Sequence, residues 1–453
     1  MTRSAARISS AVRQGRTIVV GLGRTGLACA RYLHARGIDF AVTDSRTVPP
    51  ETDALARLAP NVETHFGGFD HALLDGAAQV IASPGVSLEE PFLRAAAARG
   101  IPVIGDVELF VREARAPIAA ITGTNGKSTV TTLVAAMANA AGMRAIAAGN
   151  LGRPVLELLD EPVPQLYVLE LSSFQLETTQ SLHAAVATVL NVTPDHMDRY
   201  ASLEAYAAAK ARIFAGADAA VLNLDDPIVR SMADSVLRRL SFSVHGDERA
   251  DYRAAVDARD IVLSRRGERL LAMSELKIAG LHNAANALGA LAMCEALGLE
   301  RGPCIAALRE FPGLPHRSQF VAEVRGVRFV DDSKGTNVGA TLAAVAGMPG
   351  SLVLIAGGQG KGQDFAPLAD VFRGKVRHVV LIGQDAAQIE SVLRGVCTTE
   401  HARDMEEAVS AAARAARPGE TVLLSPACAS LDMFRDYAHR GDVFADCVRR
   451  LAP

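Results

Sequence analysis

Short apolar stretches rich in β-branched residues alternate with longer Ala- and Leu-rich stretches along almost the entire chain. The short stretches have the length and composition of buried strands, whereas the long ones, such as 89–99 and 203–214, favour helices. This alternation is typical of α/β layers built on mostly parallel sheets. No fixed-period repeat and no low-complexity tract interrupts the pattern.

The pattern divides the chain into three α/β domains. The first, 1–106, opens with a predicted strand at 17–20 and is expected to be Rossmann-like. The second, 107–313, opens with a strand at 117–121 and a glycine loop, which predicts a P-loop ATPase-like parallel sheet, and ends at a turn-rich F-P-G-L-P segment. The third, 314–453, is expected to be Rossmann-like and contains predicted strands at 352–355, 379–382 and 421–424.

The glycine loop of the second domain is the strongest local signal. It reads G-T-N-G-K-S-T over residues 123–129 and joins a predicted strand to a helix that begins at about Lys127. Such a loop turns backbone N–H groups around an anion, and the helix N-terminus adds its positive end. Lys127 would reach the outer phosphates of a nucleotide, and Ser128 or Thr129 would place a hydroxyl on Mg²⁺. The alternative is a turn without a ligand, because Ile121 occupies the first glycine position of the longer P-loop pattern.

Three polar residues downstream could complete a metal site. Glu170 ends a short predicted strand, where a carboxylate suits Mg²⁺, although a surface turn is the alternative. His196 follows another predicted strand, as sites in open α/β sheets do, but a lone loop histidine is usually a surface residue. Lys210 lies four residues after Tyr206 on a helix with Ser202 as its expected N-cap, and a helical lysine is normally solvated.

The segment G-L-H-N-A-A-N offers groups that could bind a nucleotide. Asn283 and Asn286 lie three residues apart, so on a helix they share a face and could hydrogen-bond a base or a ribose. The alternative is that Asn283 caps the helix N-terminus.

Several polar residues of the third domain are weak signals when taken one by one. Arg317 and Lys334 could bind carboxylates or phosphates, and Ser430 could hydrogen-bond a carboxylate. The segment G-G-Q-G-K-G at 357–362 is predicted to be a mobile loop in which Lys361 is a solubilising charge.

The first domain carries a G-x-G-x-x-G motif at 21–26, between a predicted strand and a predicted helix. Asp44 ends the next apolar stretch, 18 residues after Gly26. This arrangement holds a dinucleotide diphosphate, with the acid on a ribose. Taken alone, it would favour an NAD-linked oxidoreductase, but any nucleotide diphosphate could occupy it. A second glycine turn, S-P-G-V, contains Gly85 and could close over the same ligand.

Composition narrows the functional class. The net charge of −3 gives no broad basic face for nucleic acid. The six cysteines are scattered without a C-x-x-C pair, as is typical of reduced thiols in a cytosolic chain. The segment 1–16 has no apolar stretch, so we expect no signal peptide, and no segment predicts a transmembrane span. The chain is therefore expected to be cytoplasmic.

Together these segments resemble the Mur ligase family, the ATP-dependent amino-acid-adding enzymes of peptidoglycan synthesis. The resemblance follows the whole chain in order and is carried by G-T-N-G-K-S-T, E-L-S-S-F-Q-L-E, N-x-T-x-D-H-x-D, Y-x-x-A-K, H-N-x-x-N, H-R, D-S-K-x-T-N and S-P-A-C-A-S-x-D. Within the family, the chain is most similar to the member that joins D-glutamate to UDP-N-acetylmuramoyl-L-alanine. The segments 170–177, 332–337 and 425–432 favour that member, and the D-N-P-R motif of the diaminopimelate-adding relative is absent.

The resemblance implies a role for each matched residue. ATP would be bound by Gly123, Thr124, Asn125, Gly126, Lys127, Ser128, Thr129, Asn283, Asn286, Arg317 and Asp332. The UDP-linked substrate would be bound by Thr25, Gly26, Asp44, Arg46, Gly85 and Asn150. D-glutamate would be held by Lys334, Thr336, Ser430 and Tyr437. Magnesium would be bound by Ser128, Glu170, His196 and Lys210.

Lys127, His196 and Lys210 would be the catalytic residues, with Lys210 carbamylated so that it offers a carboxylate to two Mg²⁺ ions. The partners would be small molecules, without nucleic acid or membrane insertion, and the chain is expected to be a monomer. Tyr437 stands where phenylalanine is common in the family, and Asp331 where asparagine is common. The alternatives that stay open are an NAD-dependent oxidoreductase, a nucleotide-gated binding protein and a Mur-type ligase that adds a different amino acid.

Overall fold

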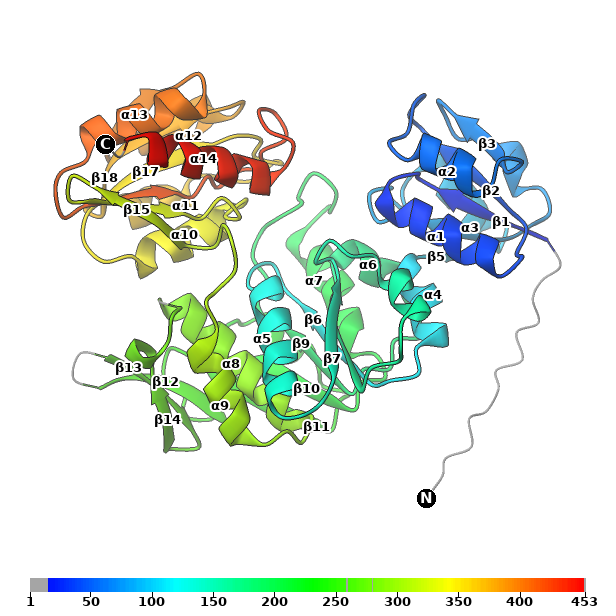
Figure 1. The fold of residues 1–453 in the computed structure, drawn as a ribbon, viewed down its shortest axis with the longest axis horizontal. Coiled ribbons are helices and arrows are strands. Elements are labelled where there is room, and N and C mark those ends of the chain that lie inside the picture. Colours follow the sequence, from blue (N-terminus) through cyan, green and yellow to red (C-terminus); the bar gives the residue numbers. More distant parts are fainter. Residues whose placement is uncertain (1–14, 258–259, 279, 452–453) are drawn as a thin grey trace.

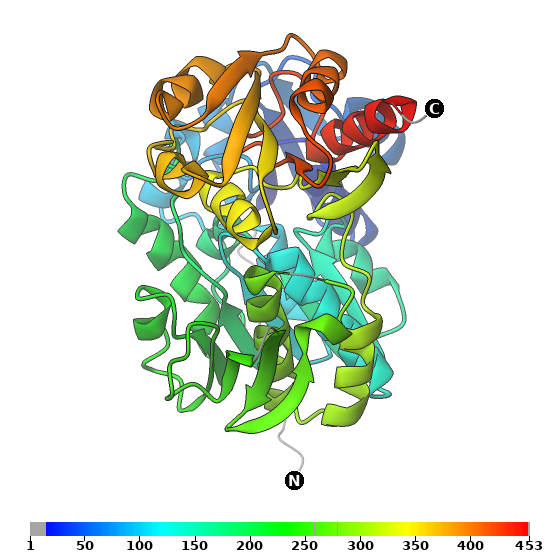
Figure 2. The ribbon, with the colours of Figure 1, turned by 90° about the vertical axis from the view of Figure 1, so that its left-hand side faces the viewer.

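Three β-sheets, each covered by helices, follow one another along the chain (Figure 1). The computed structural model describes residues 15–257, 260–278 and 280–451. Most of the segment 1–16, for which no signal peptide is expected, lies outside the described residues. The blue N-terminal body and the yellow-to-red C-terminal body both lie above the central body in Figure 1. Figure 2 shows the C-terminal body directly over the central one. The predicted α/β fold class with three domains is confirmed.

The N-terminal sheet is entirely parallel, with the order β3-β2-β1-β4-β5. Its strands are β1 (Arg16–Val20), β2 (Phe40–Asp44), β3 (Glu63–Phe66), β4 (Ala77–Ala82) and β5 (Val103–Ile104). Its helices are α1 (Arg24–Ala35), α2 (Thr52–Leu58), η1 (His71–Leu74) and α3 (Pro91–Ala98). The strands that follow β1 extend the sheet first on one side, as β2 and β3, and then on the other side, as β4 and β5. The sheet therefore has a switch point beside β1, and ligands of open α/β sheets bind at such points.

The central sheet has nine strands in the order β14-β13-β12-β11-β10-β9-β6-β8-β7. They are β6 (Ile118–Thr122), β7 (Ala145–Gly149), β8 (Leu166–Glu170), β9 (Val186–Val189), β10 (Ala219–Asn223), β11 (Arg238–Ser243), β12 (Tyr252–Asp257), β13 (Asp260–Arg265) and β14 (Glu268–Ala272). All pairs from β7 to β12 are parallel, and β13 and β14 add an antiparallel edge.

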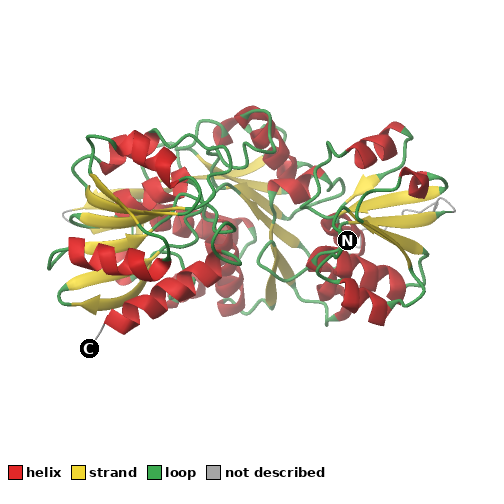
Figure 3. Ribbon diagram, turned by 90° about the horizontal axis from the view of Figure 1, so that it is seen from above, coloured by secondary structure: helices red, strands yellow, loops and turns green. Residues whose placement is uncertain are grey.

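Helices cover both faces of the central sheet (Figure 3). They are α4 (Asp106–Glu113), η2 (Val155–Asp160), α5 (Lys127–Ala140), α6 (Ser173–Glu177), α7 (Leu203–Ala211), η3 (Arg212–Phe214), η4 (Val229–Ser231), η5 (Met273–Glu275), α8 (Leu281–Ala296) and α9 (Arg301–Glu310). Successive side chains of β6 point to opposite faces. Ile118 and Ala120 therefore join the core beneath α4 and α7, whereas Ala119 and Ile121 join the core beneath α5 and α8. Burial on both faces explains why the first four residues of β6, Ile118–Ile121, are all apolar.

The C-terminal sheet has the order β15-β16-β20-β17-β18-β19 and is parallel except for the β15–β16 pair. Its strands are β15 (Gln319–Val324), β16 (Val327–Asp331), β17 (Leu352–Gly357), β18 (Val376–Ile382), β19 (Thr398–His401) and β20 (Thr421–Leu424). Its helices are α10 (Val338–Gly347), α11 (Pro367–Phe372), α12 (Ala386–Leu393), α13 (Met405–Ala415) and α14 (Tyr437–Leu451).

Two helix starts test the cap predictions. Ser202 caps α7 as predicted, because its hydroxyl accepts a hydrogen bond from the Ala205 amide at 3.2 Å. The alternative that Asn283 is an N-cap is wrong, since α8 begins at Leu281 and Gly280 is its N-cap. Asn283 therefore lies within the first turn. Among the described residues, no helix is both long enough and apolar enough to cross a bilayer.

An ion pair fastens the antiparallel edge of the central sheet to α8. The Glu295 carboxylate accepts hydrogen bonds from Arg265 Nε at 2.7 Å and from the Tyr252 hydroxyl at 2.5 Å. The hydrogen bonds from Arg265 are the main cause that lowers the pKa of Glu295 to about 2. A folded-state pKa below the unfolded value of about 4.3 stabilises the fold above pH 4.3, and this contribution disappears as the pH falls towards 2.

Glu295→Gln is therefore expected to lower the free energy of unfolding by about 1 kcal/mol at pH 7, since a charge-assisted pair becomes a neutral one. Urea unfolding at pH 7 and at pH 3 should show a smaller difference from wild type at the lower pH. Glu310→Gln is the control, because that side chain is 79% exposed and pairs with an exposed lysine. An equal loss at both pH values would contradict the prediction.

Candidate active site

The glycine loop 123–129 connects β6 to α5 at the carboxyl edge of the central sheet, and α5 begins at Lys127 as predicted. Gly126 has a φ of 82°, which favours glycine, and a Cβ atom there would lie 2.4 Å from Asn286 Oδ1. Only a residue without a side chain lets the loop approach α8 so closely. The structure thus brings Asn286 against the loop across 160 residues of sequence.

The segment after β9 holds the loop in shape. Asn191 Oδ1 accepts a hydrogen bond from the Asn125 amide at 2.8 Å, and the Asn191 carbonyl accepts one from the Thr124 amide at 2.9 Å. The Thr124 hydroxyl donates to the Thr193 carbonyl at 3.1 Å. Sequence reasoning missed these anchors, because hydrogen-bond partners about 66 residues apart leave no local pattern.

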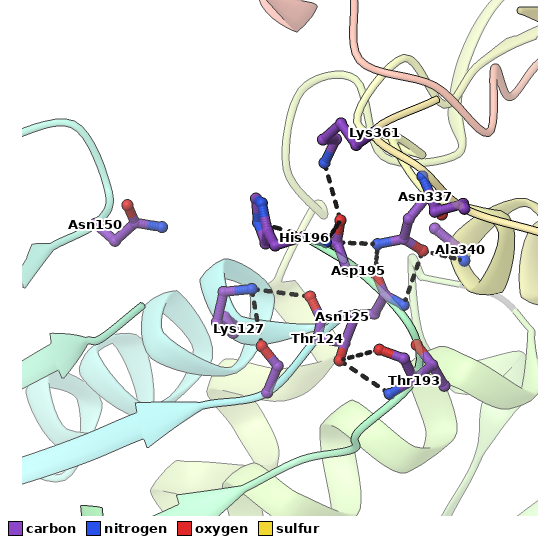
Figure 4. A network of polar contacts seen from close by, with 12 residues as sticks. Thr124, Asn125, Lys127, Asn150, Thr193, Asp195, His196, Asn337, Ala340 and Lys361 are labelled. Atoms are coloured by element: carbon purple, nitrogen blue, oxygen red, sulfur yellow. Dashed lines mark hydrogen bonds and ion pairs between the residues drawn. The ribbon is translucent and has the colours of Figure 1, made fainter. Parts of the chain in front are cut away.

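Lysine ammonium groups converge on the loop. Lys127 Nζ donates to the carbonyls of Gly123 at 3.0 Å and Thr124 at 2.8 Å, so its side chain is folded back over its own loop (Figure 4). Lys210 Nζ donates to the same Gly123 carbonyl at 2.9 Å and lies 4.3 Å from the centre of the Tyr206 ring. Burial is the main cause that lowers the pKa of both amines, and for Lys210 the Lys127 charge lowers it further. Two close cations favour an anionic ligand between them.

Lys210 is not a solvated helical lysine, because it is only 1% exposed. No ion pair joins it to a carboxylate within the part of the chain that the structure describes. A buried ammonium group without a carboxylate partner is costly, which is why the pKa of Lys210 lies well below that of an exposed lysine.

Glu170 ends β8 beside the loop and is 2% exposed, so the surface-turn alternative is wrong. Its Oε1 accepts a hydrogen bond from Asn150 Nδ2 at 2.7 Å. Its Oε2 is buried and has no hydrogen-bond partner among the described residues. A buried carboxylate oxygen without a donor is costly, and a cation would satisfy it.

The His196 ring contacts the Phe174 ring with a centroid separation of 4.9 Å. Burial lowers the pKa of His196 to about 4, so the imidazole is neutral near pH 7 and has a lone pair for a metal or a ligand. The preceding Asp195 is buried and accepts hydrogen bonds from Lys361 Nζ at 2.9 Å and Asn337 Nδ2 at 3.2 Å. His196 is therefore part of a polar network and not an isolated surface histidine.

The C-terminal body reaches into this network from above. Arg317 Nη2 donates to the Ser128 hydroxyl at 2.7 Å, and Asn337 exchanges side-chain hydrogen bonds with Asn125. Lys361 comes from the loop after β17 and is 16% exposed, so the interpretation of Lys361 as a solubilising charge is wrong. Its ion pair with Asp195 fastens the loop that was predicted to be mobile. The sequence signal that could have revealed this lysine is its place just past a strand end.

Three cavities that share lining residues contain most of the candidate residues. One of about 320 Å³ is lined by Gly85, Thr124, Asn125, Gly126, Lys127, Ser128, Asn150, Glu170, His196, Lys210, Arg317, Lys334, Thr336 and Lys361, among others. A second of about 270 Å³ shares Asn125, Gly126, Arg317 and Lys334 with the first and adds Thr129, Asn283, Asn286 and Asp332. A third of about 650 Å³ shares Gly85 and Asn150 with the first and adds Thr25, Asp44 and Arg46.

The second cavity lies between α8 of the central body and α10 of the C-terminal body. Phe242 and Leu190 give it apolar walls, as a flat base requires. At its polar end, Asp332 accepts hydrogen bonds from the Ser425 hydroxyl at 2.8 Å and the Ser318 amide at 3.0 Å. Burial raises the pKa of Asp332 to about 7, so this carboxyl is partly protonated near neutral pH.

The third cavity lies at the switch point of the N-terminal sheet. Asp44 accepts hydrogen bonds from the Leu22 amide at 2.7 Å and from Arg46 Nε at 2.8 Å, which fixes the acid between the first glycine loop and Arg46. Gly26 is buried and does not line the cavity; a Cβ atom there would lie 1.9 Å from the Gly21 carbonyl oxygen. Gly26 therefore lets α1 pack closely against the loop.

The four residues expected to bind the incoming amino acid are only partly brought together by the fold. Lys334 Nζ lies 3.8 Å from the centre of the Tyr437 ring, and burial lowers the pKa of Lys334 to about 7. Ser430 is buried near the start of the segment that leads to α14. Neither Ser430 nor Tyr437 lines the three cavities described above.

Three family models match the chain in the order of its three sheets. Residues 15–105 match "Mur ligase MurD-like, N-terminal domain", residues 121–294 match "Mur ligase middle domain", and residues 316–428 match "Mur ligase, glutamate ligase domain". A UDP-N-acetylmuramoylalanine–D-glutamate ligase from Nitrosococcus oceani is 52% identical over 437 residues, which cover 96% of each chain. The chain belongs to the Mur ligase family.

Other relatives agree with this family. The ligase of the same name from Methylobacillus flagellatus is 51% identical over 97% of this Mur ligase and 98% of its own chain. The solved structure of UDP-N-acetylmuramate-alanine ligase from Thermotoga maritima shares the fold, with a TM-score of 0.61, 19% identity and coverage of 96% and 99% of the two chains. These relatives are ligases and give no support to the oxidoreductase alternative.

Proposed function

We propose that this Mur ligase joins D-glutamate to UDP-N-acetylmuramoyl-L-alanine at the expense of ATP, through an acyl phosphate, in peptidoglycan precursor synthesis. The observation that carries the proposal is the position of the glycine loop. It lies between the buried Glu170 carboxylate and the cationic side chains of the C-terminal body, with a cavity on either side. The names of the relatives at about half identity support the same substrates.

ATP would occupy the two cavities that meet at the loop. Its base would enter the apolar slot beside Asn283 and Asn286, and its phosphates would meet the loop amides, Lys127 and Arg317. Asp332 at the polar end of the slot would accept a hydrogen bond from a ribose hydroxyl. Because the ligand would touch α8 and α10 together, its binding would also fasten the C-terminal body to the central body.

A carboxylate resists attack by an amine, since oxide is a poor leaving group. Transfer of the γ-phosphoryl group to the substrate carboxylate makes phosphate the leaving group, and the D-glutamate amine then attacks the acyl carbon. Lys127 would neutralise charge on the transferring group as it moves. Neutral His196 would donate its ring N–H to the tetrahedral oxyanion. The buried cavity would exclude water, which would otherwise hydrolyse the acyl phosphate.

The residues fit a magnesium site that the nucleotide completes. No three His, Cys, Asp or Glu side chains among the described residues are grouped closely enough to hold a metal by themselves. Mg²⁺, however, commonly takes one or two carboxylates together with substrate phosphates. The open oxygen of Glu170, the Ser128 hydroxyl and neutral His196 offer such ligands. Bound Mg²⁺, proposed as two ions, would neutralise phosphate charge.

Carbamylation of Lys210 is part of this proposal. The reaction adds CO₂ to a neutral amine and releases a proton, so a lowered pKa favours it. The product carries a carboxylate where an ammonium group would repel a metal ion. A carbamate on Lys210 would therefore supply a further anionic ligand for Mg²⁺ beside the glycine loop.

D-glutamate would enter between the C-terminal body and the loop. Lys334 and Thr336 line the 320 Å³ cavity, and Lys361 adds a third group that can meet a carboxylate. Ser430 and Tyr437 would complete the site from the segment around the start of α14. Asp44, Arg46, Thr25 and Gly85 would hold the uridine diphosphate, Gly26 would keep α1 close to the glycine loop, and Asn150 would lie where the two substrates meet.

The proposal includes a cytoplasmic monomer with domain boundaries near 106 and 313. Cytoplasmic placement follows from the substrates, since ATP and UDP-linked precursors are cytosolic compounds.

A phosphate-release assay tests the reaction. With UDP-N-acetylmuramoyl-L-alanine, Mg²⁺ and ATP, we expect phosphate release only when D-glutamate is present, at least about tenfold faster than with L-glutamate, D-aspartate or meso-diaminopimelate. Cationic groups at fixed positions recognise the spacing of the two carboxylates, which excludes D-aspartate, and the amine must also point at the acyl carbon, which excludes L-glutamate because its configuration is opposite. NADH absorbance in the presence of candidate oxo acids, which NADH would reduce to hydroxy acids, is the matched control. Faster release with another amino acid would overturn the assigned substrate, and oxidation of NADH would overturn the reaction class.

A further inference from the structure

The 650 Å³ cavity between the N-terminal and central bodies contains two buried polar side chains with no role so far. Asp44 and Arg46 line one end of this cavity, and Asn150 lines another part of it, beside Glu170. Asp106 and Gln175 also line it. Neither residue belongs to the diphosphate loop 21–26 or to the phosphate loop 123–129.

Asp106 is the first residue of α4 and is 2% exposed. Its Oδ1 atom is buried and has no hydrogen-bond partner among the described residues. Burial raises the pKa of Asp106 to about 6. A buried oxygen without a donor costs about 1–3 kcal/mol. The cost is recovered when a ligand supplies the missing donor.

Gln175 is a hydrogen-bond partner of the Asp106 carboxyl group. The Gln175 Oε1 atom is used within α6, where it accepts hydrogen bonds from the Ser172 amide at 3.1 Å and the Ser172 hydroxyl at 3.3 Å. This capping box fixes the side chain and leaves its amide N–H group to donate to Asp106. The α6 helix thus holds one partner of the carboxyl group in place, while Asp106 lines the cavity and its Oδ1 atom has no donor among the described residues.

The negative charge of Asp106 restricts which chemical groups of a ligand it can bind. A carboxylate without a cationic partner repels phosphate groups, so Asp106 is unsuited to the diphosphate of the substrate. The part of a UDP-N-acetylmuramoyl-peptide that lies between its diphosphate and its reacting carboxylate carries amide N–H groups and sugar hydroxyls. These are neutral donors of the kind that Oδ1 lacks.

We propose that Asp106, oriented by Gln175, binds an amide N–H or hydroxyl group of the sugar-peptide part of the substrate and so distinguishes it from other uridine nucleotides. The inference rests on the proposed function, because it takes the UDP-linked substrate from there.

Calorimetric titration of the full chain with two ligands tests the inference. Asp106→Ala is expected to weaken binding of UDP-N-acetylmuramoyl-L-alanine at least about tenfold and to change binding of UDP less than about twofold, because only the first ligand carries the sugar-peptide. Asp106→Asn keeps a carbonyl acceptor and should bind the first ligand within about threefold of wild type. Asp53→Ala, an exposed acid in α2, is the control for loss of negative charge in the same body.

Each outcome decides one point. Equal weakening for UDP and for the full ligand would overturn the inference and assign Asp106 a structural role near the diphosphate loop. Unchanged binding of both ligands by Asp106→Ala would overturn it as well. If wild type bound neither ligand, the proposed function would fail together with the inference, whereas a failure confined to the variants leaves the proposed function standing. Thermal melting of each variant identifies any loss caused by unfolding, and Asp106→Asn then provides the deciding comparison.

Discussion

Replacing Lys127 by alanine is expected to lower kcat for phosphate release by about 10²- to 10³-fold. The Lys127 ammonium group lies over the glycine loop, bonded to the Gly123 and Thr124 carbonyls, and lines the same cavity as Glu170 and His196. When a phosphate binds, the Lys127 ammonium group would leave those carbonyls and form a stronger, charge-assisted hydrogen bond to the phosphate. Initial rates at saturating ATP and both other substrates measure the effect.

A matched lysine provides the control for this variant. Lys277 is 53% exposed and pairs with an exposed glutamate, so Lys277→Ala should keep the wild-type kcat. Retention of more than about a tenth of the activity by Lys127→Ala would count against a direct part for this amine in phosphoryl transfer. A rise in KM for ATP without a change in kcat would assign Lys127 to ground-state binding alone.

Lys210→Met is expected to lower kcat by on the order of 10²-fold and to remove a carbamate from the protein. Methionine keeps the length and the apolar stem of the buried side chain, so the packing against Tyr206 is largely preserved. Carbon-13 NMR of protein equilibrated with labelled bicarbonate should show one slowly exchanging carbamate resonance in wild type and in Lys277→Ala. That resonance should be absent from Lys210→Met.

The pH dependence of the carbamate follows from the direction of the Lys210 pKa. Burial lowers this pKa well below that of an exposed lysine, so at any given pH a larger fraction of the Lys210 amine is neutral than of an exposed lysine. The carbamate resonance should therefore be present at pH 7 and weaken under acid, as the amine takes up a proton. Wild-type activity with no carbamate resonance would show that uncarbamylated Lys210 suffices.

Local sequence predicted the elements whose causes are local. An apolar strand, a glycine turn and a helical run are neighbours in the chain, so the junction at Lys127 and the cap at Ser202 are found where the pattern placed them. The ordered motifs also sufficed to predict the family and the three-domain α/β class, because each motif keeps its place along the chain. The Asn283 cap was wrong because one residue type, without its backbone geometry, does not determine where a helix begins.

Only the tertiary structure decided how solvent and charge are distributed around those residues. Lys210 looked like a solvated helical lysine, Glu170 like a strand-end acid and Lys361 like a surface charge, yet all three are buried or half-buried at one site. Their burial depends on chain segments far away: Lys361 meets Asp195 across 166 residues, and Arg317 meets Ser128 across 189. Desolvation and ion pairing act through space, so the sequence determined which groups this protein possesses, and the packing of its three bodies determined which of them are neutral, paired or left open for a ligand.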